Sequence, residues 1–151
     1  MLRKLCKDQT ILSIVPEASV HQAAALMTMH RVGALPVVRD DKLVGIFTER
    51  DLVNRVITPR LDPDQTPVVR VMTENPKTIT FDQSVCDALR LMQIHGFRHL
   101  PIIDDQRIVG IISLRDIPLE YHILKDRWDE AQRGYKTHKQ TQPDRQSMKV
   151  D

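Results

Sequence analysis

Apolar residues recur at helical spacing in two segments of the chain. In residues 20–27 and 85–92 they return every three or four positions, which places them on one face of a helix. Ser19 and Ser84 stand directly before these segments and are candidate N-caps, because a serine hydroxyl can accept a hydrogen bond from the first helical turn. Gln or Asp follows three positions after each serine, which completes a capping-box pattern. The sequence therefore predicts two helices that begin after these serines.

Two pairs of short β-rich runs follow the predicted helices. "LPVV" and "KLVGIF" are joined across "RDD", and "LPII" and "RIVGII" are joined across "DDQ". Such runs on either side of a short polar turn predict β-hairpins. A strand before each helix ("TILSIV", "KTITF") and a second helix starting at Thr48 or Ser113 complete the order β-α-β-β-α, twice.

The two halves of the chain are copies of one unit. Adding 65 to a residue number carries the first half onto the second without a gap, and 14 of the 36 positions from Pro16 to Asp51 are then identical. Such a match indicates a repeated supersecondary unit, and one copy of about 50 residues would bury too little surface alone. We therefore expect an α/β (α+β) fold in which two β-α-β-β-α repeats pack with pseudo-twofold symmetry.

Composition divides the chain into four predicted segments. These are the first repeat (1–58), a proline-rich linker (59–70), the second repeat (71–120), and a C-terminal helix with a disordered tail (121–151). In the helix expected after Pro118, Leu119, Ile123 and Trp128 should face inward, and the polar residues beyond Tyr135 should be disordered.

Composition and charge narrow the function classes. The net charge of +2 is too small to indicate binding to nucleic acid or to a membrane surface. No apolar run has the length of a membrane span, so we expect a cytoplasmic location. Cys6 and Cys86 form no CxxC motif, and His30 and His95 fall near predicted helix ends, where a cation favours the helix dipole. With no activated nucleophile, metal cluster or glycine-rich phosphate loop in the sequence, we predict no enzymatic activity and no metal site.

The repeated sequence "GIFTERD" (45–51) and "GIISLRD" (110–116) admits two interpretations. Thr48 with Asp51, and Ser113 with Asp116, form capping-box patterns that can simply begin a helix. Alternatively, a glycine inside a strand often marks the close approach of a ligand, and the N–H groups at a strand-to-helix junction suit phosphate or sugar groups. Local chemistry leaves both interpretations open.

The chain resembles a tandem pair of cystathionine-β-synthase (CBS) domains, often called a Bateman module. The resemblance covers roughly residues 8 to 120 and is carried by "VMTENP", by "LPVV" and "LPII", and by the doubled "GIFTERD" and "GIISLRD". The first copy departs from it with "KDQTILSIVP" in place of "VMTxNP". The resemblance implies a regulatory sensor that binds an adenosine-containing ligand (AMP, ADP or ATP, or else NAD or S-adenosylmethionine) between the copies. AMP is the ligand expected first, and no cofactor is required.

The resemblance also implies roles for single residues. Asp51 and Asp116 would each hydrogen-bond a ribose, and Thr48 and Ser113 would contact ribose or phosphate. The residues expected to enclose the adenine base are Ile11, Ile14, Leu35, Pro36, Ile79, Leu100 and Pro101.

Phosphate contacts are expected to differ between the two clefts. In the first cleft, built on Thr48 and Asp51, the opposite copy supplies Arg98 and His99, with Arg115 a weaker candidate. In the second cleft, built on Ser113 and Asp116, the matching positions hold only a glycine and an alanine, and Arg50 alone remains. The first cleft is therefore expected to fill first.

Two functions remain open on the sequence. The first is a homodimeric adenine-nucleotide sensor that regulates an unidentified protein. The alternative is a ligand-free CBS pair that serves as a dimerisation or protein-interaction scaffold. Val53, Val56 and Ile57 either belong to a dimer face or lie in the internal core.

Overall fold

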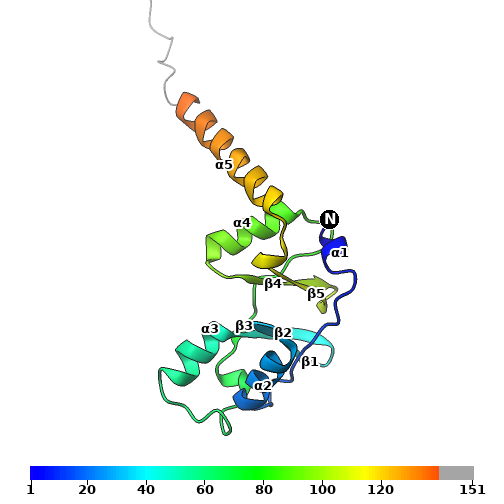
Figure 1. Cartoon of the computed structure of the whole chain (residues 1–151), viewed down its shortest axis with the longest axis vertical. Coiled ribbons are helices and arrows are strands. Elements are labelled where there is room, and N and C mark those ends of the chain that lie inside the picture. Colours follow the sequence, from blue (N-terminus) through cyan, green and yellow to red (C-terminus); the bar gives the residue numbers. More distant parts are fainter. Residues whose placement is uncertain (140–151) are drawn as a thin grey trace, which may run out of the picture. The chain divides into compact units, whose positions relative to one another are not determined.

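The computed structural model describes residues 1–139, and the side chains of residues 1–133. It contains two compact units, the first Met1–Ile117 and the second beginning at Pro118. The elements of the first unit are α1 (Leu2–Leu5), α2 (Val20–His30), β1 (Ala34–Arg39), β2 (Lys42–Thr48), α3 (Glu49–Asp51), η1 (Leu52–Ile57), η2 (Val68–Arg70), β3 (Thr73–Glu74), α4 (Val85–His95), β4 (His99–Asp104), β5 (Arg107–Ser113) and η3 (Leu114–Asp116) (Figure 1). The second unit contains α5 (Leu119–Lys139). Of these, η1 is a π-helix, and η2 and η3 are 3-10 helices.

The two predicted capped helices are confirmed. Ser19 Oγ accepts a hydrogen bond from the backbone N–H of Gln22 at 3.1 Å, and the Gln22 side chain accepts one from the N–H of Ser19 at 2.9 Å. Ser84 and Asp87 make the same reciprocal pair at the start of α4. These bonds satisfy N–H groups that have no partner within the helix, which explains why both helices begin at a serine.

Both predicted hairpins are also confirmed. β1 pairs antiparallel with β2, and β4 pairs antiparallel with β5. The register is equivalent in the two repeats, with Leu35 opposite Phe47 and Leu100 opposite Ile112. Each hairpin has its irregularity at the same place, two residues after the proline of "LP".

The strand predicted before each helix is reduced to a single β-bridge. Ile14 pairs parallel with Val37, and Ile79 pairs parallel with Ile102. The strand pairing of each leading segment ends there because the chain turns directly afterwards, at Val15–Ala18 in the first copy and at Thr80–Gln83 in the second.

Each hairpin is flanked by the segment that opens the other repeat. β3 pairs with β2 through Gly45 opposite Glu74, which gives the first sheet the order β1-β2-β3. At the second hairpin, α1 lies beside β5 (Figure 1), and Gln9 Oε1 accepts a hydrogen bond from the N–H of Ile111 at 3.2 Å. Cys6 packs against Gly110, where an added Cβ would lie 3.2 Å from its sulfur. The two repeats are therefore interlocked by these crossing segments.

The core of the first repeat is aliphatic apart from one phenylalanine, as the low aromatic content requires. Its buried members are Val20, Ala23, Met27, Leu35, Val37, Phe47, Val56, Val68, Val71 and Met72. The last three come from the crossing segment (residues 68–74), which joins the linker to the start of the second repeat. The core of the first repeat is therefore complete only when this segment docks.

The helix predicted after Thr48 is confirmed, but the one predicted after Ser113 is wrong beyond one turn. In the first repeat α3 continues into η1, whereas in the second η3 ends at Asp116. Pro118 explains the difference, because the residue before a proline disfavours helical backbone angles. Ile117 accordingly has φ −87° and ψ 120°.

The C-terminal helix is confirmed as α5, but the inward orientation predicted for its apolar residues is wrong. Leu119, Ile123 and Trp128 are all exposed, since a periodic pattern identifies an apolar face but does not fix whether its side chains are buried. The helix also runs past Tyr135 to Lys139, where disorder was expected, while the rest of the predicted tail lies outside the described residues. Among the described helices, none has the length and apolar character needed to cross a membrane.

Candidate functional site

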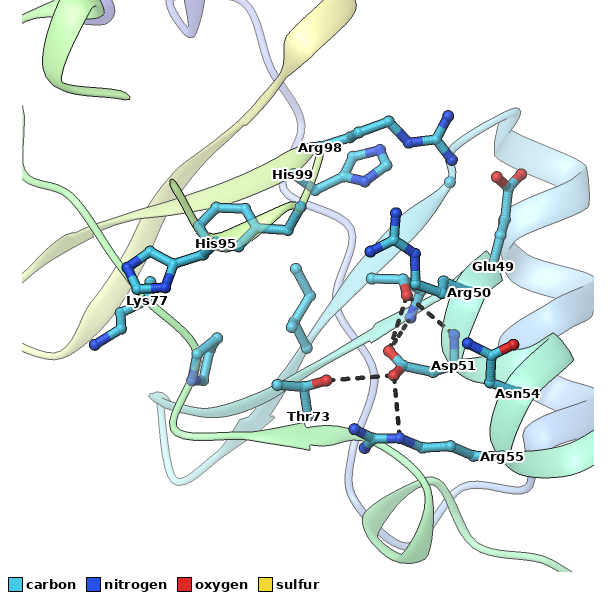
Figure 2. Close-up of a pocket in the computed structure, with 15 residues that line it drawn as sticks. Glu49, Arg50, Asp51, Asn54, Arg55, Thr73, Lys77, His95, Arg98 and His99 are labelled. Carbon is cyan, nitrogen blue, oxygen red and sulfur yellow. Dashed lines mark hydrogen bonds and ion pairs between the residues drawn. The ribbon is translucent and has the colours of Figure 1, made fainter. Parts of the chain in front are cut away.

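A cavity of about 320 Å³ lies between the two repeats of the first unit. One wall comes from the start of α3, with Thr48 and Asp51, and the other comes from the start of β4, with Arg98 and His99 (Figure 2). Each wall forms where a hairpin strand meets a helix or a connecting turn. This cavity is the first cleft of the sequence analysis.

The carboxylate of Asp51 is held tightly at the start of α3. It is only 7% exposed, and its Oδ2 accepts hydrogen bonds from the N–H of Thr48 at 3.0 Å and from the Thr48 hydroxyl at 2.9 Å. Its Oδ1 lies 3.3 Å from the hydroxyl of Thr73 and 3.5 Å from Nε of Arg55. The capping interpretation is thereby confirmed for this pair. It does not exclude a ligand, because the contacts of Oδ1 are long.

The opposite wall carries a partly buried imidazole. Burial lowers the pKa of His99, and the nearby positive charges of Arg98 and Arg115 lower it further, against the opposing effect of Glu49 and Asp116. The ring approaches Gly33 so closely that an added Cβ there would lie 3.2 Å from His99 Cε1. His99 therefore favours its neutral form in this cavity.

Positive charge exceeds negative charge around the cavity. The charged side chains that line it are Glu49, Arg50, Asp51, Arg55, Lys77 and Arg98. Four of these are cations and two are carboxylates, so the cavity suits a ligand that carries negative charge and also offers hydroxyls to a buried acceptor. His95, stacked on Phe97 with ring centroids 5.9 Å apart, supplies an aromatic surface at the same cavity.

The structure brings together five of the predicted site residues. These are Thr48, Arg50, Asp51, Arg98 and His99. Placing Arg50 at the second cleft was wrong. Its Nη1 donates a hydrogen bond to the carbonyl of Gly96 at 2.7 Å, so the side chain spans the first cleft from one repeat to the other.

The residues expected to enclose adenine do not line this cavity. Leu35, Leu100 and Ile79 are almost fully buried in the packed interior, and both prolines are buried beside them. Ile11 and Ile14 are partly exposed. The remaining members, Pro36 and Pro101, accept the bridge hydrogen bonds from Ile14 and Ile79 through their carbonyls. Contacts from this set to a base stay a prediction.

The second cleft has a similar cap but a different environment. Asp116 Oδ2 accepts a hydrogen bond from the N–H of Ser113 at 2.9 Å, so capping is confirmed here too. Asp116 is exposed, in contrast to Asp51. Burial and the charge of Asp116 raise the pKa of Cys6. Arg115 is exposed and is not among the residues that line the first cleft.

Several residues that line the cavity were not predicted from the sequence. Arg55 stands one helical turn after Asp51, a spacing that could have revealed it. Lys77 follows the "VMTENP" segment, and Thr73 lies within it. Nothing local to these two residues indicates that they reach the first repeat, because the crossing of the chain places them there.

Comparison with known proteins points to the same family in sequence and in structure. The family described as "CBS domain" matches residues 7–58 and 68–118. The CBS domain-containing protein YhcV of Bacillus subtilis is 38% identical over 107 residues, which cover 71% of this chain and 76% of that protein.

Two solved structures resemble the fold. A protein with CBS domains from Burkholderia ambifaria is 32% identical, with a TM-score of 0.72, over 76% of this chain and 88% of that one. A CBS domain protein from Pyrobaculum aerophilum, solved in complex with AMP, is 26% identical, with a TM-score of 0.72, over 82% of this chain and 94% of that one. The chain therefore belongs to the CBS domain family, as a tandem pair of the domains that make up regulatory modules.

Proposed function

We propose that this protein is a regulatory module that binds an adenosine-containing ligand, AMP first, in the first cleft. One observation carries the proposal. The cavity sets the buried carboxylate of Asp51, beside the hydroxyl of Thr48, across from Arg98 and His99 of the other repeat. A ligand with a sugar at one end and an anion at the other would match both walls.

The ribose end of the ligand would contact Asp51. A carboxylate accepts hydrogen bonds at both oxygens, and within residues 1–133 the contacts of Oδ1 are two long ones, at 3.3 and 3.5 Å. A ribose hydroxyl can therefore donate to Oδ1 without displacing the capping bonds that Oδ2 makes to Thr48.

The phosphate end would contact the cations of the cleft. Arg98 and Lys77 are exposed at the cavity, and a guanidinium matches phosphate oxygens through paired N–H donors. The neutral His99 can donate one N–H to the same group. Charge-assisted bonds of this kind favour AMP over adenosine.

Size and relatives support the same ligand class. The cavity of about 320 Å³ lies at the lower end of the range for small-molecule sites, which suits a mononucleotide better than a dinucleotide. The Pyrobaculum aerophilum relative of similar fold was solved with AMP. ADP, ATP, NAD and S-adenosylmethionine remain further candidates for the site.

The alternative is a ligand-free scaffold, and one observation favours it. The hydrogen bonds of Thr48 and Asp51 form a complete capping box without any ligand. In that case the charged cavity would serve only to hold the two repeats together.

A thermal-shift panel separates the two proposals. AMP, ADP, ATP, NAD and S-adenosylmethionine would be compared with adenosine and GMP. A ligand at 100 times its Kd stabilises the folded state by about 2.7 kcal/mol, which raises Tm by roughly 5–10 °C for a chain of this size. We expect such a rise with AMP and less with GMP. No rise with any adenosine ligand would favour the scaffold.

Regulation of another protein and self-association are also part of the proposal. The regulatory class implies a protein whose activity the module controls, and the two exposed apolar residues of η1 are compatible with a homodimer. The cytoplasmic location expected from the sequence stays a prediction.

A further inference from the structure

We propose that Arg55 is a positioning residue for ribose recognition, which holds Asp51 by anchoring it to the crossing segment that leads into β3. This inference rests on the proposed function. It assigns to Arg55 a role in orienting the acceptor, distinct from direct attraction of the phosphate.

The guanidinium of Arg55 is fixed by the backbone of the crossing segment. Its Nη1 donates hydrogen bonds to the carbonyl of Met72 at 2.6 Å and to that of Val71 at 3.3 Å. Its Nε lies 3.5 Å from Oδ1 of Asp51, one helical turn earlier (Figure 2). The two carbonyls belong to buried residues, so their positions are fixed, and they hold the guanidinium although the Arg55 side chain is 49% exposed.

The two oxygens of Asp51 are thereby given different tasks. Oδ2 is occupied by the N–H and the hydroxyl of Thr48. Oδ1 is aimed between Arg55 and the hydroxyl of Thr73 without a short bond to either. Both contacts are long, so a ribose hydroxyl that donates a shorter hydrogen bond to Oδ1 can replace the weaker of them while the other still orients the carboxylate.

The second repeat lacks this arrangement. The 65-residue shift that relates the repeats carries Arg55 to Glu120 and brings Asp8 to the position of Thr73. Neither residue can donate a hydrogen bond to a carboxylate when it is ionised. The equivalent aspartate, Asp116, therefore has no counterpart of this support in the sequence, although it also accepts a hydrogen bond from the N–H of its capping residue.

The proposal predicts a specific loss in binding experiments. Calorimetry would measure the affinities of the full chain for AMP and for 2′,3′-dideoxy-AMP. The second ligand lacks the ribose hydroxyls that would donate hydrogen bonds to Asp51. We expect the unchanged protein to prefer AMP by at least about tenfold. Arg55→Gln should weaken AMP binding and leave dideoxy-AMP binding nearly unchanged, so the preference shrinks toward one. Thr73→Val, which keeps the side-chain shape, should shift the preference in the same direction.

Two further variants serve as controls for this experiment. Arg39→Gln removes an exposed arginine that pairs with Glu17 outside the cleft and should leave both affinities unchanged. Arg55→Lys keeps the charge but not the fork of donors, so it should restore only part of the preference.

Three outcomes would overturn the inference. If Arg55→Gln weakens both ligands equally, Arg55 acts on phosphate or on folding. If Arg55→Gln and Thr73→Val both leave the preference for AMP intact, neither residue positions the carboxylate. If the unchanged protein binds no AMP, the proposed function fails, and this inference fails with it. The first two results leave AMP binding itself established, so the two failures are distinguishable.

Discussion

Asp51 and Asp116 occupy equivalent positions in the two repeats, yet only Asp51 is buried. Both accept a hydrogen bond from the N–H of the capping residue three positions earlier, at 3.0 and 2.9 Å. Asp51 is 7% exposed and has further contacts with Thr73 and Arg55, whereas Asp116 is exposed. An acceptor that is already desolvated and oriented loses less free energy of solvation and less conformational entropy when it binds a hydroxyl. The two clefts are therefore unequal, although their sequence motifs match.

Substitution of the two aspartates should give unequal effects on AMP binding. A hydrogen bond to a charged group is worth about 1.5–3 kcal/mol, so we expect Asp51→Ala to weaken AMP binding roughly 10- to 150-fold. Asp116→Ala should change the first binding event much less. Calorimetry on both variants, with circular dichroism to verify folding, would measure this. If both variants fold and bind AMP as tightly as the unchanged protein, the motif serves helix capping alone.

The stability of the ligand-free protein should depend on pH through His99. Burial, and then Arg98, lower the pKa of this imidazole below its ordinary value of 6.5. Between that lowered pKa and 6.5, the unfolded chain binds more protons at this group than the folded protein. The free energy of unfolding should therefore fall as the pH drops through 6.5 toward the pKa of folded His99.

Urea unfolding from about pH 7 to pH 5 would measure this dependence. His99→Gln should flatten the decline, while His30→Gln, at the exposed C-terminal end of α2, serves as the matched control. A decline that is equally steep in His99→Gln would assign it to other groups.

The elements that could be predicted from the sequence are those with local determinants. Ser19 and Ser84 cap their helices through residues three positions away, and each hairpin closes through a short turn, so a short window contains the necessary information. The end of η3 also has a local cause, Pro118, but the prediction of a helix after Ser113 did not take it into account. The internal repeat also predicted that the two halves of the chain would have the same order of helices and strands.

The parts that could not be predicted depend on the crossing of the chain. Thr73 and Lys77 reach the first cleft because the opening segment of the second repeat docks on β2. No periodicity within that segment indicates which hairpin it joins. The orientation of Arg50 across the cleft to Gly96 is likewise a long-range contact. The motif thus revealed the aspartate and its cap, but not the residues that surround them.

Self-association should involve η1. Val56 is fully buried in the core, whereas Val53 is 54% and Ile57 59% exposed, so the two interpretations of this segment each hold for part of it. Two apolar side chains one helical turn apart would be covered in a twofold dimer. We expect a dimer by light scattering at micromolar concentrations, and a monomer after Val53→Lys with Ile57→Lys.

The matched control for this dimer is Val15→Lys, which changes an exposed valine outside the helices and should leave the dimer intact. A wild-type monomer, both with and without AMP, would contradict dimerisation.

Arg98 should discriminate between AMP and adenosine. It lines the first cleft from the opposite repeat, where a permanent cation suits a phosphate, whereas His99 favours its neutral form because burial lowers its pKa. One charge-assisted contact is worth about 1.5–3 kcal/mol, so Arg98→Ala should weaken AMP binding by roughly tenfold or more. Adenosine has no phosphate, and its binding should change little. Arg39→Ala is the matched control, because this arginine pairs with Glu17 and does not line the cavity. If Arg98→Ala leaves AMP affinity untouched, or if AMP is found only beside Asp116, the phosphate end of the ligand does not lie where the charges of the first cleft suggest.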